Sequence, residues 1–170
     1  MADVLLVDGY NMIGSWDELA PLKETGLDAA RDALCGILSR YVSYRWDRII
    51  VVFDAYRVPG RKRLPVSEDS FAVIFSGEGE TADLAIERLT GDLVAAGHTV
   101  QVATSDALEQ LLILAKGATR ISARELRLQF LEIDRQMDEK YTNPGSKRQM
   151  LDTRLDEHTR DVLERWRQGR

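Results

Sequence analysis

Four aspartates lie where they could carry out chemistry together. Asp8 ends one short apolar run, Asp54 ends a second, and Asp106 follows a third after a short turn. Asp83 occurs in the first turn of a predicted helix. Converging carboxylates repel one another unless a cation or a proton neutralises them, and Mg²⁺ and Mn²⁺ prefer such oxygen ligands. The pattern therefore indicates an all-oxygen metal site, and phosphodiester hydrolysis is the reaction class that best matches such a site.

The elements predicted around these acids explain why they would meet. Predicted strands and helices alternate along the chain, which favours a three-layer α/β/α sandwich with a mainly parallel sheet. The carboxyl ends of parallel strands share one edge, and ligands bind outside that edge. Strand order is not predicted. The strands are expected at residues 4–7, 49–53, 71–75 and 99–103, and the helices at residues 27–44, 80–96, 106–116 and 122–140.

Length and composition restrict the class of protein. The 170 residues fit one domain, 1–170, with a final amphipathic helix at about residues 153–167. The longest apolar run, residues 49–53, is far shorter than a span of ~20 residues, so no membrane segment is expected. The N-terminus lacks the pattern of a signal peptide. One cysteine and two histidines exclude an internal disulfide and a Cys/His zinc site, and a cytoplasmic protein is the expectation.

Each acid also has a simpler explanation as part of a helix or turn. Glu80 and Asp83 could complement the positive end of the helix dipole, and their i,i+3 spacing puts both on one face. Asp106 could be an N-cap, and Asp8 could belong to a turn. Acids at three strand ends are harder to explain in this way than any one of them singly. The fourth metal ligand stays open between Asp54 and Glu80.

The segment after the first strand, residues 9–14, contributes further polar candidates. Asn11 could donate to a phosphate or hold a carboxylate in place. The segment lacks the Gly-Lys-Ser/Thr of a Walker loop. Position 10 is Tyr10 rather than a second aspartate, which argues against a covalent aspartyl-phosphate mechanism. Tyr10 and Trp16 could stack on an unpaired base, although a core role is the alternative for each.

Charge is distributed unevenly in a way that suits a metal site beside a phosphate-binding surface. The net charge of −5 divides into −7 over residues 1–106 and +2 over residues 107–170. Two basic clusters are candidate RNA contacts, with an ordinary solvated surface as the alternative for both. The first cluster is Arg57, Arg61, Lys62 and Arg63, and the second is Lys116, Arg120, Arg124 and Arg127.

Four acidic blocks occur in an order that resembles the YacP-like branch of the NYN domains, which are relatives of the PIN-domain nucleases. The blocks are residues 7–14 (VDGYNMIG), 51–55 (VVFDA), 80–83 (ETAD) and 103–106 (ATSD), and residues 122–126 (SAREL) match the branch as well. Residues 76–79 (SGEG) are more glycine-rich than is usual in this branch.

The resemblance implies a PIN-like fold and a divalent-metal ribonuclease. The family's acidic positions fall on Asp8, Asp83 and Asp106, with Asn11 in the same pocket. Members of the branch are associated with the ribosome and with cleavage of mRNA there, so ribosome-bound mRNA is the implied substrate.

The leading hypothesis is an endoribonuclease that uses Mg²⁺ or Mn²⁺ and a metal-activated water. A noncatalytic RNA- or ribosome-binding module is the first alternative, and it predicts RNA binding that survives chelation. A metal-dependent phosphatase acting on small molecules is the second. The sequence predicts neither the cleavage-site preference nor the oligomeric state.

Overall fold

The computed structural model describes residues 1–57, 66–67 and 70–142 of the chain. It has two compact units, residues 1–130 and residues 131–170. Within the described residues, no helix is long and apolar enough to cross a membrane. The elements are β1 (Asp3–Asp8), α1 (Gly9–Ser15), α2 (Leu22–Thr25), α3 (Leu27–Ser39), β2 (Arg48–Phe53), the 3₁₀ helix η1 (Ala55–Arg57), β3 (Val66–Ser67), β4 (Phe71–Phe75), α4 (Ala82–Ala95), β5 (Thr99–Ala103), α5 (Ala107–Ala115), β6 (Thr119–Ile121) and α6 (Ala123–Thr142).

The first unit is built on a sheet with the strand order β3-β4-β2-β1-β5-β6. All neighbouring strands are parallel except β3 and β4, which pair antiparallel at the edge. The mainly parallel sheet is therefore confirmed. β1 and β2 lie in its middle, and their continuous apolar sequences fit strands that are buried on both faces.

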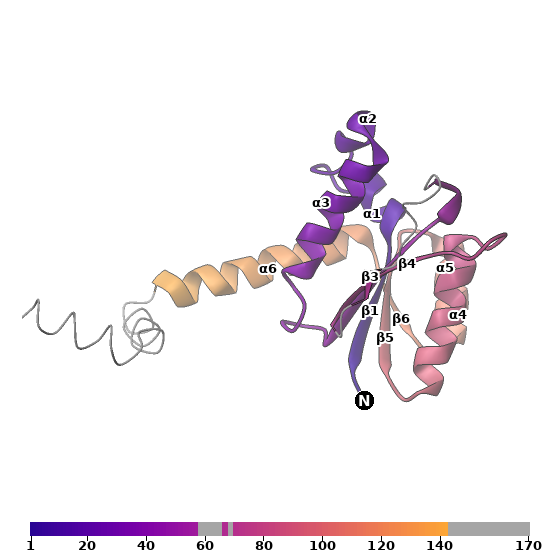
Figure 1. Ribbon diagram of the computed structural model, residues 1–170. Coiled ribbons are helices and arrows are strands. Elements are labelled where there is room, and N and C mark those ends of the chain that lie inside the picture. The colour runs from indigo at the N-terminus through magenta and orange to yellow at the C-terminus, as the bar shows by residue number, and fades with distance from the viewer. Residues whose placement is uncertain (58–65, 68–69, 143–170) are drawn as a thin grey trace, which may run out of the picture. The chain divides into compact units, whose positions relative to one another are not determined.

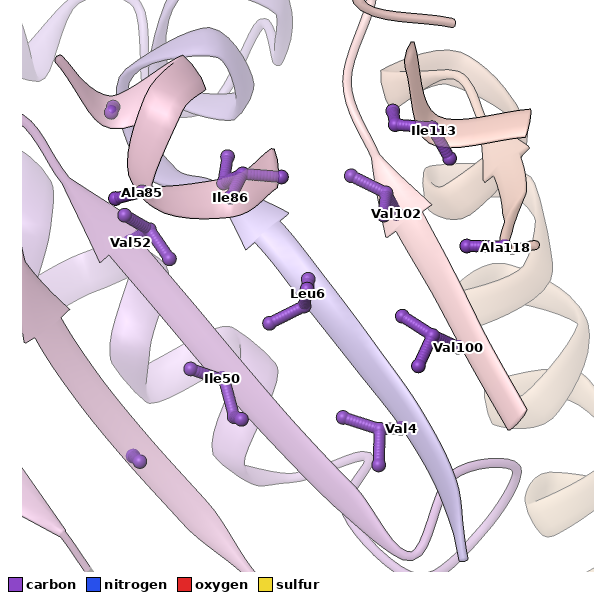
Figure 2. Close-up of a cluster of buried hydrophobic side chains, with 12 residues drawn as sticks. Val4, Leu6, Ile50, Val52, Ala85, Ile86, Val100, Val102, Ile113 and Ala118 are labelled. Carbon is purple, nitrogen blue, oxygen red and sulfur yellow. The ribbon is translucent and has the colours of Figure 1, made fainter. Parts of the chain in front are cut away.

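Helices cover both faces of this sheet, which makes the three-layer sandwich (Figure 1). On one face, alternate strand residues such as Leu6 and Val52 pack against Ile86 of α4 and Ile113 of α5 (Figure 2). On the other face lie α1 and α3. Phe130 of α6 stacks on Tyr41 there, with ring centroids 3.9 Å apart.

Several elements differ from the sequence-based predictions. α1 forms in a segment for which no helix was predicted, because the Asp8 side chain accepts the Asn11 N–H and caps the helix. β6 was not predicted, and it places Arg120 in a strand, so Arg120 does not lie on one helix with Arg124 and Arg127. α3 ends at Ser39 rather than at residue 44. The predicted helix at residues 153–167 lies outside the described residues.

The start of α6 follows the prediction closely. Ser122 and Glu125 form a reciprocal capping box: Ser122 N–H donates to Glu125 Oε2 at 2.8 Å, and Glu125 N–H donates to Ser122 Oγ at 3.1 Å. The described part of the second unit is the latter half of this helix. Arg135 there pairs with Glu132 and Glu139 at 2.6 and 2.5 Å.

Candidate active site

Alternation along the central strands brings the acids to one place. Asp8 continues the series Val4 and Leu6, whose side chains pack on the α4 side of the sheet. Asp8 is paired with Val52 in the neighbouring strand, and Asp54 follows two residues later. A pocket of about 380 Å³ forms at these strand ends, hereafter the acid pocket. It is lined by Asp8, Tyr10, Asn11, Asp54, Thr81, Ala82, Asp83 and Asp106.

Two helix N-termini border the acid pocket. Asp106 is the N-cap of α5, and its Oδ1 accepts the Leu108 N–H at 2.9 Å. Thr81 is the N-cap of α4, with Asp83 in the first turn. The capping explanation for Asp106 is therefore correct, yet the same carboxylate also lines the pocket. Positive helix ends partly compensate the clustered negative charge and favour a bound phosphate.

The loop carrying Asp106 is held by two long-range contacts. The Asn11 side-chain oxygen accepts the Ser105 N–H at 2.9 Å, which ties the start of α1 to the end of β5. Arg120 Nε donates to the Thr104 carbonyl at 3.0 Å, and Thr104 Oγ1 accepts the Asp106 N–H at 3.2 Å. Arg120 thus fastens the loop behind Asp106 by a backbone hydrogen bond.

Glu109 is a further acid of this site, and the sequence analysis missed it. Asp8, Asp83 and Glu109 each have one carboxylate oxygen within 4.8 Å of the corresponding oxygens of the other two. At this separation the three residues could bind one metal ion. Glu109 is only 5% exposed. Among the described residues, neither of its carboxylate oxygens has a hydrogen-bond partner of normal geometry. A buried carboxylate without donors is costly unless it is protonated or bound to a cation.

The pKa values reflect this crowding. Burial raises the pKa of Glu109 to about 7, and the charges of Asp83, Asp8 and Asp106 add to the rise, which the Thr104 hydroxyl only partly opposes. Burial also raises the pKa of Asp83, with further contributions from Asp106 and Asp54. The acids therefore form one electrostatic cluster that a divalent cation would relieve.

The pattern of α5 explains why Glu109 was missed. The helix is rich in leucine, which suggests that its leucines face the core. Instead Leu108 is 79% exposed and Leu111 is also exposed, while Glu109 and Ile113 point inward. The available signal was the spacing Asp106-x-x-Glu109, which places a second acid one turn after a strand-end aspartate.

Glu80 lies outside the acid pocket. It precedes the N-cap of α4 rather than occupying the first turn, and its Oε2 accepts the Gly77 N–H at 2.9 Å. Its Oε1 accepts a hydrogen bond from Arg88 Nε at 3.1 Å, and this bond is the main reason why its pKa is lowered. Of the two candidates for a fourth ligand, the structure brings Asp54 to the other acids and turns Glu80 toward Arg88.

The second basic cluster predicted for RNA is largely engaged within the protein. Lys116 Nζ lies 3.9 Å from Glu87 Oε1, and Arg127 Nε lies 2.8 Å from Glu18 Oε1. Arg124 is exposed. For the first cluster, Arg61, Lys62 and Arg63 lie outside the described residues, and the Arg57 backbone belongs to η1.

Tyr10 and Trp16 take core positions rather than exposed ones. Tyr10 is 8% exposed, its hydroxyl accepts a hydrogen bond from Arg31, and its ring meets Phe53 edge-on. Trp16 is buried, and its indole N–H donates to the Ala123 carbonyl at 2.9 Å. Tyr10 still borders the acid pocket, but little of its ring is accessible for stacking.

Comparisons with known proteins agree with this architecture. The profile of the YacP-like NYN domain family matches residues 5–168. The chain is 41% identical over 167 residues to the uncharacterized protein YacP of Bacillus subtilis, and the match covers 98% of both chains.

Two crystal structures of Rae1 (YacP) from Bacillus subtilis are also similar. One matches with 41% identity and a TM-score of 0.71, covering 98% of this chain and 95% of that one. A point mutant matches with 37% identity and a TM-score of 0.71, covering 95% of this chain and 98% of that one. The chain belongs to the YacP-like NYN domain family, whose domain is of the PIN-like nuclease type.

Proposed function

We propose that this protein is a divalent-metal-dependent endoribonuclease whose site is the acid pocket together with Glu109. The observation that carries the proposal is the convergence of the buried Glu109 carboxylate with Asp8 and Asp83. Family membership supports a nuclease-type activity. A purely structural role would leave an uncompensated acid beside three other carboxylates, which is unfavourable.

The residues present fit a hard cation. Asp8, Asp83 and Glu109 offer oxygen ligands at compatible separations, and neither oxygen of Glu109 accepts a hydrogen bond of normal geometry among the described residues. Mg²⁺ or Mn²⁺ bound there would lower the pKa of a water molecule and offset charge on the scissile phosphate. Asp54 and Asp106 complete the acidic wall of the pocket.

The remaining groups act by positioning and by charge. Asn11 holds the Ser105–Asp106 turn, so the Asp106 carboxylate keeps its place at the N-terminus of α5. The N-termini of α4 and α5 border the pocket, and their positive ends favour a bound phosphodiester over a neutral ligand. The carboxylates repel any phosphate in the absence of a cation, so cleavage requires metal.

On the strength of the resemblance in the four acidic blocks and of family membership, we propose that the RNA is mRNA and that cleavage takes place in association with the ribosome. Free and ribosome-bound mRNA are therefore the two substrates to compare.

The test uses the purified chain and three variants with free and ribosome-bound mRNA, with Mg²⁺, Mn²⁺ or a chelator. Asp8→Asn keeps a capping side chain and Glu109→Gln keeps the side-chain shape, so both should fold while losing cleavage. Glu80→Gln is the matched control outside the pocket and should cleave like the parental protein.

Several outcomes would overturn the proposal. Parental-rate cleavage by Asp8→Asn would remove the acid pocket from the reaction. RNA binding that survives chelation, with no product under any condition, would favour a binding module. Turnover of a phosphomonoester with none on RNA would favour a phosphatase.

A further inference from the structure

A solvent-exposed aromatic side chain lies in the short helix that follows Asp54, a residue of the acid pocket. Tyr56 is 72% exposed and follows Asp54 by two residues in η1. Its backbone N–H donates to Asp54 Oδ1 at 3.0 Å, so the position of Tyr56 is coupled to that of a pocket carboxylate. Burial of an aromatic ring against a ligand is favourable, so an exposed ring at the edge of a site is available for binding.

Tyr56 forms one wall of a separate hollow, hereafter the tyrosine pocket. Its volume is about 360 Å³, and it is lined by Ala55, Tyr56, Gly77, Glu78 and Gly79. The absence of side chains on Gly77 and Gly79 leaves backbone surface facing the hollow. Gly79 has φ +75°, a left-handed conformation that favours glycine at this position.

Two hydrogen bonds join the chain segments that form the two sides of the tyrosine pocket. The Ala55 N–H donates to Ser76 Oγ at 2.9 Å, and the Ser76 N–H donates to the Phe53 carbonyl at 2.9 Å. Both bonds join the end of β2 to the end of β4. The relative position of the two sides of the tyrosine pocket therefore depends on the sheet rather than on a single side chain.

The chemistry of the lining favours a nucleobase over a phosphate. Among the described residues, none of the five that line the pocket is basic, and Glu78 is an exposed acid that would repel a phosphate. An aromatic ring provides a stacking surface for any base, and a carboxylate accepts hydrogen bonds from exocyclic amino groups. Ala55 and the two glycines leave room for a flat ligand beside the ring.

We propose that the tyrosine pocket is a nucleobase subsite: an unpaired base next to the cleaved phosphodiester stacks on Tyr56 and donates its amino group to Glu78. The inference rests on the proposed ribonuclease function and names the form of its substrate, which is single-stranded RNA at the site of cleavage. Adenine, cytosine and guanine carry the amino group, and uracil lacks it, so uracil is disfavoured at this position.

Binding is the first measurement, because it does not depend on turnover. Short fluorescent single-stranded RNAs are titrated by anisotropy onto the Asp8→Asn protein and onto the same protein carrying Tyr56→Ala, Tyr56→Phe or Tyr44→Ala. Tyr44 is another exposed tyrosine, which lines neither the acid pocket nor the tyrosine pocket, and it serves as the control. Tyr56→Ala should weaken binding by roughly 5- to 100-fold, whereas Tyr56→Phe and Tyr44→Ala should bind within about 2-fold.

Base identity is the second measurement. RNAs that differ only at the nucleotide beside the cleavage site, with each base or an abasic residue, are compared for kcat/KM in an otherwise parental protein. The abasic and uracil substrates should be the poorest. Glu78→Gln should reduce the difference between uracil and cytosine, and Tyr56→Ala should make the abasic and normal substrates alike.

The outcomes separate this inference from the proposed function. RNA cleavage with unchanged binding and kcat/KM in Tyr56→Ala overturns the subsite and leaves the ribonuclease standing. Tyr56-dependent binding without any cleavage supports the subsite and contradicts the ribonuclease. Equal losses of RNA affinity in Tyr56→Phe and Tyr56→Ala would assign the effect to the hydroxyl group and overturn stacking. Binding of an RNA duplex as tightly as of a single strand would also overturn stacking of an unpaired base.

Discussion

Asn11 and Ser105 are 94 positions apart in the chain, and the Asn11 side-chain oxygen accepts the Ser105 N–H at 2.9 Å. This hydrogen bond joins the segment after β1 to the turn after β5. The acids on either side of it, Asp8 and Asp106, are thereby held across the mouth of the same pocket. Asn11 is accordingly a positioning residue for the carboxylates.

Replacing Asn11 by alanine should release the turn that carries Asp106. We expect a loss of about 10- to 100-fold in activity or metal affinity, as for other groups that orient ligands, and roughly 0.5–1.5 kcal/mol of stability. Metal titrations of RNA cleavage measure the first effect, and urea unfolding measures the second. Gln136→Ala, on the exposed half of α6, is the control. Unchanged metal dependence in Asn11→Ala would contradict the positioning role.

Glu109 should make the stability of the metal-free protein depend on pH. Its pKa is about 7 in the folded protein against an ordinary value of 4.5, so the folded state binds more protons than the unfolded state between these values. Its contribution to stability is therefore full below pH 4.5 and is lost as the pH rises to about 7.

Glu109→Gln removes this titration. The variant should resemble the parental protein at pH 4.5 and exceed its free energy of unfolding by roughly 1–3 kcal/mol at pH 8. Urea unfolding at the two pH values tests this difference. Added Mg²⁺ or Mn²⁺ should narrow the gap at pH 8, since a bound cation stabilises the parental carboxylates. The same difference at both pH values would contradict the shifted pKa.

Gly9 should tolerate no larger residue, because α1 approaches β2 very closely there. A Cβ atom at Gly9 would lie 2.5 Å from Phe53 Cδ1, and Phe53 is buried. We expect Gly9→Ala to cost about 1–3 kcal/mol through overpacking and to disturb Asp8. Gly36→Ala is the matched control, because a Cβ in α3 meets nothing within 4 Å. It should be stabilising by roughly 0.5–1 kcal/mol. Thermal unfolding of both variants checks the contrast.

Arg120 should affect catalysis without acting as a phosphate contact. Its Nε bonds the Thr104 carbonyl behind the Asp106 turn. Arg120→Ala should therefore lower kcat, while the slope of log Kd against log salt for RNA stays as in the parental protein. Arg124 is exposed, so Arg124→Ala should reduce that slope by about 1, the change expected for the loss of one phosphate contact. A reduced slope in Arg120→Ala would contradict the positioning role.

Much of the framework followed from local patterns in the sequence. Continuous apolar runs predicted the central strands, because a strand buried on both faces has no polar positions to alternate with. The Ser122–Glu125 pair predicted the start of α6, because a capping box involves only neighbouring residues. The short strands β3 and β6 were not predicted, since two or three residues carry no periodicity of their own.

The sequence by itself determined that Asp8 and Asp54 lie at the ends of buried strands and that the fold is an α/β sandwich, because continuous apolar runs and helix spacing are local properties. Only the tertiary structure decided the membership of the site. Glu80 and Glu109 are the same residue type, and each lies close to the start of a helix. Glu80 accepts a hydrogen bond from the Arg88 guanidinium and lies outside the acid pocket, whereas Glu109, in the first turn of α5, lies close to Asp8 and Asp83. Which neighbour a carboxylate meets depends on how helices pack on the sheet, and no local spacing encodes that.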